Sequence, residues 1–227
     1  FMVLMSSQSV LTQKLLLLIS SCIAMGFFAT SAHATPTVFG YVMEVQMTPA
    51  VCLFDSQGSK KRKCLEGYSL NITGLYPETT TRECQTKSSA VLSPLQTKVV
   101  ARVMPDEHAR RQLWAEIGGC VPMSASQYFR NVINYAERLK IPADLTSSEN
   151  KTAQLHSLRG QFQLLNPGLP ASGLRFSCRT HRQTNILTEV KVCYKPNGQY
   201  KGCAENIQEN CPNSFAIKGT SECLSRN

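Results

Sequence analysis

Ten cysteines are the feature that most limits the folds open to this 227-residue chain. One of them, Cys22, lies in an apolar leader, and the other nine are spread from Cys52 to Cys223. No two of these nine have the C-x-x-C spacing that zinc sites and redox motifs commonly show. In a secreted chain such cysteines form disulfides. The sequence therefore predicts a fold tied by bridges, with one thiol left over because nine cysteines cannot all pair.

The leader indicates that the chain is exported. A lone positive charge precedes the apolar run Leu15–Phe28, and Ala32–Ala34 follows as an A-x-A cleavage site. These features predict a secretory signal peptide over residues 1–34 and a periplasmic or secreted mature chain over residues 35–227. Two alternatives stay open: a membrane anchor, for which the apolar run is short, and a lipoprotein site at Ile19–Cys22.

Removal of the leader would leave 227 − 34 = 193 residues, which is enough for one domain with a sizeable core. The formal net charge of +9 would fall to +8, because Lys14 is the only charged residue lost. A basic secreted domain tends to meet anions such as nucleic acid, anionic lipid or acidic polysaccharide. Composition does not choose among them. No internal repeat, low-complexity tract or linker divides residues 35–227, so a single domain is expected.

The pattern of apolar residues predicts an α+β fold. Alternating or short apolar runs indicate strands at 38–47, 69–73, 174–178, 186–194 and 214–218. Helical spacing indicates helices after Ser93, after Asp106 and after Ser124, and another over 152–165. Gln96 stands where it can complete a capping box with Ser93. Because the helices gather between early and late strands, we expect an antiparallel sheet.

Two short segments resemble the active-site segments of the ribonuclease T2 family. The family patterns run roughly F-T-I-H-G-L-W-P and H-E-W-x-K-H-G-T-C, and this chain has Leu70–Pro77 and Gln112–Cys120 at the matching places. The frame of both patterns is kept at Ile72, Gly74, Leu75, Pro77, Trp114, Gly118 and Cys120. The resemblance extends from Phe39 to about Gly219 and is to the periplasmic bacterial branch of the family. It implies a central antiparallel sheet flanked by helices and stapled by disulfides.

The same resemblance implies how the cysteines pair, which spacing alone does not fix. The implied disulfides are Cys52–Cys64, Cys84–Cys120, Cys178–Cys211 and Cys193–Cys203. Cys223 would be the unpaired cysteine.

The chemical groups of the family are missing at the matching positions. Thr73 replaces the first histidine, and the second segment has Gln112, Leu113, Glu116 and Ile117 in place of His, Glu, Lys and His. Members of the family cleave RNA by transphosphorylation, in which one histidine takes the 2′-hydroxyl proton and another protonates the leaving oxygen. A threonine hydroxyl holds its proton too tightly for this role, and leucine and isoleucine do not titrate. Glu116 places an anion where a cation should stabilise the phosphate.

The resulting hypothesis is a catalytically inactive ribonuclease T2-like protein that binds RNA, another polyanion or a protein partner. Tyr76 and Trp114 could stack on bases, although a tryptophan on this helix also suits the core. Arg110 and Arg111 could meet phosphates, with a solvated helix face as the simpler interpretation. The basic run Lys60–Lys63 is either a solvated hairpin tip or a phosphate-contacting patch.

Two other hypotheses stay open. The first is an active secreted endoribonuclease that cleaves single-stranded RNA through 2′,3′-cyclic phosphates with relocated groups, for which His108, His156 and His181 are the available histidines. His108 is nine residues before Ile117, which is about 13 Å of helical rise, so the two positions should not reach the same phosphate. The second is a partner-binding module that forms an intermolecular bridge through Cys223. No cofactor or metal is expected, because the histidines are scattered and disulfides account for the cysteines.

Overall fold

In the computed structural model, which describes residues 35–55 and 62–221, the sheet is built around β1 (Val38–Met47). This strand pairs antiparallel with β2 (Leu70–Thr79) on one side and with β5 (Thr184–Tyr194) on the other. The predicted alternation, which places Phe39, Tyr41, Met43, Val45 and Met47 on one face, is confirmed at the last four, which are all buried. It is wrong at Phe39, which is 53% exposed at the start of the strand.

The sheet has six strands in the order β2-β1-β5-β6-β3, with β4 also paired to β5. The remaining strands are β3 (Lys151–Gln154), β4 (Leu174–His181) and β6 (Ser214–Ile217). Every pairing is antiparallel except a short parallel contact between β5 and β6. The predicted α+β class with a central antiparallel sheet is therefore confirmed, with this one parallel contact as an addition.

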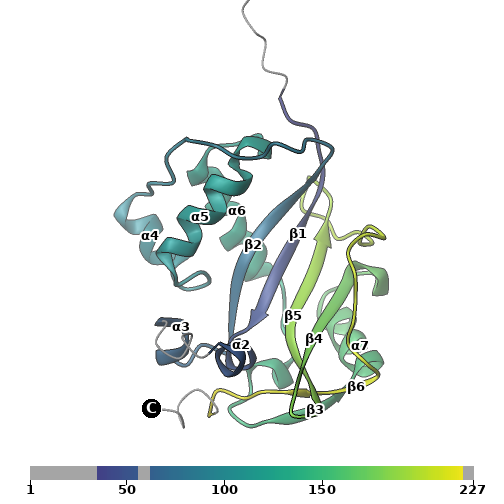
Figure 1. Ribbon diagram of the computed structural model, residues 1–227. Helices are drawn as coiled ribbons and strands as arrows, with labels where there is room; N and C mark the ends of the chain where they lie inside the picture. The colour runs from purple at the N-terminus through teal and green to yellow at the C-terminus, as the bar shows by residue number, and fades with distance from the viewer. Residues whose placement is uncertain (1–34, 56–61, 222–227) are drawn as a thin grey trace, which may run out of the picture. The chain divides into compact units, whose positions relative to one another are not determined.

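Six α-helices lie in the part of the chain that the structure describes. They are α2 (Thr48–Phe54), α3 (Arg62–Leu65), α4 (Pro94–Val100), α5 (Glu107–Ile117), α6 (Ala125–Arg138) and α7 (Leu155–Leu165). Short 3-10 turns follow at Gly118–Cys120, Ala143–Thr146 and Ala171–Gly173. Figure 1 shows α4, α5 and α6 grouped beside β2, whereas α7 lies beside β4 and β6.

The helix starts follow local chemistry. The Asp106 side chain accepts a hydrogen bond from the Ala109 amide at 3.1 Å, which caps α5 as predicted. Ser93 caps α4 by accepting from the amide of Gln96. The predicted capping box at α4 is wrong, because the Gln96 side-chain amide donates to the Ser126 carbonyl instead and so ties α4 to α6.

Two predicted elements differ most in their bounds. The segment from residue 152 was predicted as helix, but Lys151–Gln154 is β3, and α7 begins only at Leu155. Pairing with β6 supplies the backbone hydrogen bonds of β3 and outweighs its local preference. The strand predicted at 69–73 continues to Thr79, because β1 pairs with it along nearly its whole length.

Four disulfides staple the part of the chain that the structure describes. They are Cys52–Cys64, Cys84–Cys120, Cys178–Cys211 and Cys193–Cys203. These are the four pairs that the family resemblance implies. The leader, Cys223 and the basic residues Lys60 and Lys61 lie outside the described residues. Within the described residues, no helix is long and apolar enough to cross a membrane.

Candidate functional site

The first motif lies on β2, where Thr73 occupies an irregular point in the ladder. The register between β1 and β2 shifts between Glu44 and Val45, and Thr73 is the residue left over at this β-bulge. A bulge re-aims the side chain that it carries. The Thr73 hydroxyl is within 3.2 Å of Oε2 of Glu44 on the neighbouring strand, to which it donates a hydrogen bond.

The second motif lies on α5, where the replaced positions separate into two faces. Leu113 and Ile117 are 4% and 7% exposed and belong to the hydrophobic core. Gln112 and Glu116 are on the exposed face, where the Gln112 amide donates to Oε1 of Glu116 at 2.9 Å. The side chains at the two matched histidine positions of this helix, Gln112 and Ile117, therefore offer an amide and an aliphatic group.

The Glu44 carboxylate that accepts the Thr73 hydrogen bond belongs to a charged cluster formed by β1 and β5. Nζ of Lys191 is 3.2 Å from Oε1 of Glu44 and 3.3 Å from Oε1 of Glu189. Glu44 lies directly opposite Lys191 in the ladder between β1 and β5, so strand pairing brings these groups together. One ammonium thus faces two carboxyl groups, one of which, Glu44, contacts Thr73.

Burial and neighbouring charge shift the ionisation of this cluster. Burial, and then the nearby Glu44 carboxylate, raise the pKa of Glu189 above its usual range. Burial disfavours the charged form of Lys191, but the carboxylates of Glu189 and Glu44 outweigh it and raise the pKa of Lys191. Burial together with Glu44 raises the pKa of Tyr76 to about 12, in spite of its hydrogen bond with Thr73.

Sequence reasoning did not assign Glu44 or Lys191 to the site. A signal was present, because Glu44 interrupts an apolar strand, and Glu189 and Lys191 interrupt another at a spacing of two residues. Side chains two apart on a strand lie on the same face. What the sequence does not contain is the register that places Glu44 opposite Lys191.

Tyr76 remains available at the edge of this cluster. Its side chain is half-buried, and its ring lies over Gly74, where a Cβ atom would come within 2.7 Å of the ring. A side chain at position 74 would therefore displace the ring. This contact gives a physical reason for glycine at that position of the motif.

Two of the four predicted ligand-binding residues are buried. Trp114 is 3% exposed, packs near Tyr128 and donates its indole N–H to Ser88 at 3.0 Å, so it belongs to the core and has no face free for a base. Arg110 is 4% exposed and donates to the Met104 carbonyl, so it does not lie on a solvated face. Arg111 is exposed and forms an ion pair with Glu107 at 2.6 Å.

The three histidines of the described residues do not converge on Thr73. His108 and His156 are exposed on helices. His181 lies at the tip of the β4–β5 hairpin and contacts the Phe54 ring edge-on. Its partner Thr184 is seven residues along β5 from Lys191, a distance of about 23 Å for an extended strand. Over the described residues, no group of three or more His, Cys, Asp or Glu could hold a metal ion.

The described chain has a ribonuclease T2-like fold, as comparison with solved structures shows. Ribonuclease MC1 from the seeds of bitter gourd superposes with a TM-score of 0.60 at 19% identity, covering 78% of this chain and 99% of that chain. Japanese pear S3-RNase gives a TM-score of 0.59 at 19% identity, covering 79% and 100%. An RNase-related protein from Calystegia sepium gives 0.58 at 14% identity, covering 79% and 97%.

These identities establish the fold and leave the activity open. No protein-family model matches the chain, and no curated protein matches it. Any function must therefore be argued from the residues of the site.

Proposed function

We propose that this protein is a non-catalytic ribonuclease T2-like protein, exported to the periplasm or secreted, that acts by binding RNA, another polyanion or a protein partner. The observation that carries the proposal is the position of Thr73. Its hydroxyl is hydrogen-bonded to the Glu44 carboxylate at the place where the family pattern has a histidine. A general base must accept a proton near neutral pH, and a threonine hydroxyl does not.

The second segment supports the same proposal. Leu113 and Ile117 stand where the family pattern has polar catalytic groups, and both side chains are buried in the core. The family pattern has histidines at the places of Thr73 and Ile117, and each such acid–base group typically contributes about 10²–10⁴-fold to a rate. Loss of two of them leaves little catalysis.

Electrostatics also disfavour a phosphate beside Thr73. Glu44 and Glu189 share only the ammonium of Lys191, and Glu116 adds a carboxylate on α5. A carboxylate at ~4 Å from a phosphate charge repels it by about 4 kcal/mol at an effective dielectric constant of ~20. If the protein binds a polyanion, we expect the phosphates to lie away from this cluster.

The alternative is an active T2-type endoribonuclease that cleaves single-stranded RNA through 2′,3′-cyclic phosphates with relocated groups. The observation that favours it is the cluster itself. Glu189, whose pKa is raised, and the Lys191 ammonium supply an acidic group and a cation next to Glu44, which contacts Thr73. These groups, and not the histidines, are the ones that a nuclease test must include.

The decisive experiment measures cleavage and binding of a fluorescent single-stranded RNA by the disulfide-intact mature chain. We expect no turnover above a mock-purified preparation, and the same trace for Glu44→Gln, Glu189→Gln and wild type, because the wild type has no working acid–base pair. Binding followed at low and physiological salt shows whether the ligand is a polyanion.

The outcomes separate the hypotheses. Turnover that Glu189→Gln abolishes and the exposed control Glu116→Gln retains would establish the alternative and reject the proposal. Salt-sensitive binding without turnover supports a polyanion-binding role. If the protein shows neither turnover nor RNA binding, a protein partner is the ligand to seek, by capture from the periplasmic or secreted fraction.

A further inference from the structure

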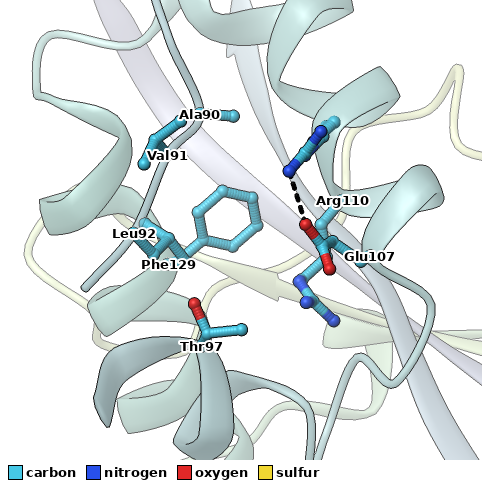
Figure 2. A pocket seen from close by; sticks show the side chains of 8 residues that line it. Ala90, Val91, Leu92, Thr97, Glu107, Arg110 and Phe129 are labelled. Atoms are coloured by element: carbon cyan, nitrogen blue, oxygen red, sulfur yellow. Dashed lines mark hydrogen bonds and ion pairs between the residues drawn. The ribbon is translucent and has the colours of Figure 1, made fainter. Parts of the chain in front are cut away.

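A small cavity lies between α4, α5, α6 and the loop at residues 90–92, outside the replaced motif positions. Its volume is about 70 Å³. Figure 2 shows loop residues Ala90 and Val91 with Phe129 and Thr97 on one side of this space, and Glu107 and Arg110 on the other. The loop and three successive helices, all between residues 90 and 138, thus contribute to one cavity.

The cavity has a buried floor and an exposed mouth. Arg110 is 4% exposed and Phe129 is fully buried, so the floor is shielded from solvent. At the mouth, Val91 is 77% exposed, and the exposed pair of Arg111 and Glu107 lies 2.6 Å apart. Figure 2 marks that ion pair with a dashed line.

The charge of the lining favours an anion. Two guanidinium groups and one carboxylate line the cavity, which gives a net charge of +1. The Arg111–Glu107 pair is exposed and is therefore weak. The Arg110 guanidinium is shielded from water and donates to the Met104 carbonyl, and the attraction between its charge and an anion acts more strongly where water is excluded. The planar fork of an arginine matches the oxygens of phosphate and carboxylate groups.

The volume limits the size of the ligand. A cavity needs roughly 10–15 Å³ for each water that it holds. The cavity therefore holds about five atoms of that size, which corresponds to the five heavy atoms of a tetrahedral oxoanion. A nucleobase or a sugar ring would not fit inside it.

We propose that this cavity binds a phosphate group, with Arg110 and the Thr97 hydroxyl at the floor and Arg111 at the mouth. The proposal goes beyond the function proposed above and holds whether or not the Thr73 site is catalytic. Two ligands carry such a phosphate group. One is free inorganic phosphate, and the other is the terminal phosphomonoester of an RNA whose chain leaves through the mouth past Val91.

Titration calorimetry of the mature chain with inorganic phosphate, at constant ionic strength set with chloride, tests the site. Arg110→Met should weaken binding about tenfold or more, because it removes a charge-assisted donor. Thr97→Val, which keeps the shape of the side chain, should weaken binding about fivefold. Glu107→Gln should tighten it about two- to fivefold, because it removes the one anion in the lining. Arg130→Met, at an exposed position on α6, is the control that should change nothing.

Thr97→Val should weaken phosphate binding and Glu107→Gln should tighten it, so the proposal stays testable even if Arg110→Met does not fold. A purely structural role for these residues would not make Glu107→Gln bind phosphate more tightly. The proposal is overturned if the wild type shows no saturable binding of phosphate beyond chloride, or if Thr97→Val and Glu107→Gln both bind like wild type.

A second arm identifies the source of the phosphate group. The wild type is titrated with one short RNA sequence in two forms, with and without a terminal phosphate. Tighter binding of the phosphorylated form, lost in Thr97→Val, assigns the cavity to RNA ends. Equal binding of the two forms, with retained binding of inorganic phosphate, assigns it to the free ion.

Discussion

At the residue scale, the group that controls the site is Lys191. Its ammonium contacts both Glu44 and Glu189, whose side chains are each only about one-fifth exposed. Carboxylates with this little solvent are costly to ionise unless a cation faces them. Lys191 therefore makes it possible for Glu44 and Glu189 to lie close together. The pH at which Glu189 ionises then depends on how strand pairing places these groups.

We expect Glu189→Gln to gain stability relative to wild type as pH rises. The folded pKa of Glu189 is raised above the usual 4.5 by burial and by Glu44. A raised carboxyl pKa means that the folded state holds the proton more tightly than the unfolded state, so its stabilising contribution is complete below 4.5 and is lost as pH rises through the folded pKa. Glutamine cannot ionise and removes this loss.

Urea unfolding of both proteins at several pH values between about 4 and 8 measures the effect. The difference in free energy of unfolding, variant minus wild type, should become more positive with pH. The exposed Glu116→Gln is the control, whose difference should stay flat. A difference for Glu189→Gln that is flat or falls with pH would contradict the assigned environment.

The residues of α5 show how far the sequence carried the site. Arg110, Leu113, Trp114 and Ile117 are spaced three, four and seven residues from the first, which is one helical face. The three apolar members predict a buried face, and Arg110 belongs to it by position. A charged residue is almost never expected inside, and that expectation hid its place in a cavity. Only the packing of α4 and α6 around it settles its burial.

At the element scale, a single tyrosine joins α6 to the motif strand. The hydroxyl of Tyr128 accepts from the Leu75 amide at 2.9 Å and donates to the Leu75 carbonyl at 3.1 Å. Tyr128 is fully buried and Leu75 is 1% exposed, so no solvent replaces these bonds. This contact fixes β2 against α6 two residues beyond Thr73.

Replacing Tyr128 by phenylalanine should therefore lower the free energy of unfolding by about 2–3 kcal/mol, because two buried backbone groups lose their partner. Tyr68→Phe is the matched control. Its hydroxyl donates to the Ala101 carbonyl at 3.3 Å in a partly buried place, so a cost of less than about 1 kcal/mol is expected. Equal losses for the two variants in urea unfolding would show that the Leu75 contact is not what fixes β2.

Elements that depend on local chemistry were predicted well, and those that depend on distant partners were not. Ser93, Asp106 and Ser124 cap helices where the sequence placed them, since a cap needs only residues three positions away. The strand at Lys151–Gln154 was missed because its partner β6 lies some sixty residues later. A strand of four residues has no pattern strong enough to indicate that pairing on its own.

At the scale of the whole molecule, the four disulfides connect parts that the sheet does not. Cys84–Cys120 joins the loop after β2 to the turn after α5, and so ties the two replaced segments together. Cys193–Cys203 closes a much shorter loop beyond β5. The family resemblance, and not spacing, supplied these pairs, because many connectivities are compatible with nine cysteines.

Loss of Cys84–Cys120 should cost more stability than loss of Cys193–Cys203. The chain-entropy estimate is about 3–4 kcal/mol for a separation of 36 residues and about 2.5–3 kcal/mol for a separation of 10. Paired Cys→Ala variants test this order by urea unfolding, and each removes one cysteine that is fully buried, Cys120 or Cys193, so the loss of buried sulfur is similar. If the order is reversed, the bridges act mainly through native packing. The two motif segments would then be held together by the core around Leu113 and Tyr128, and not by the bridge.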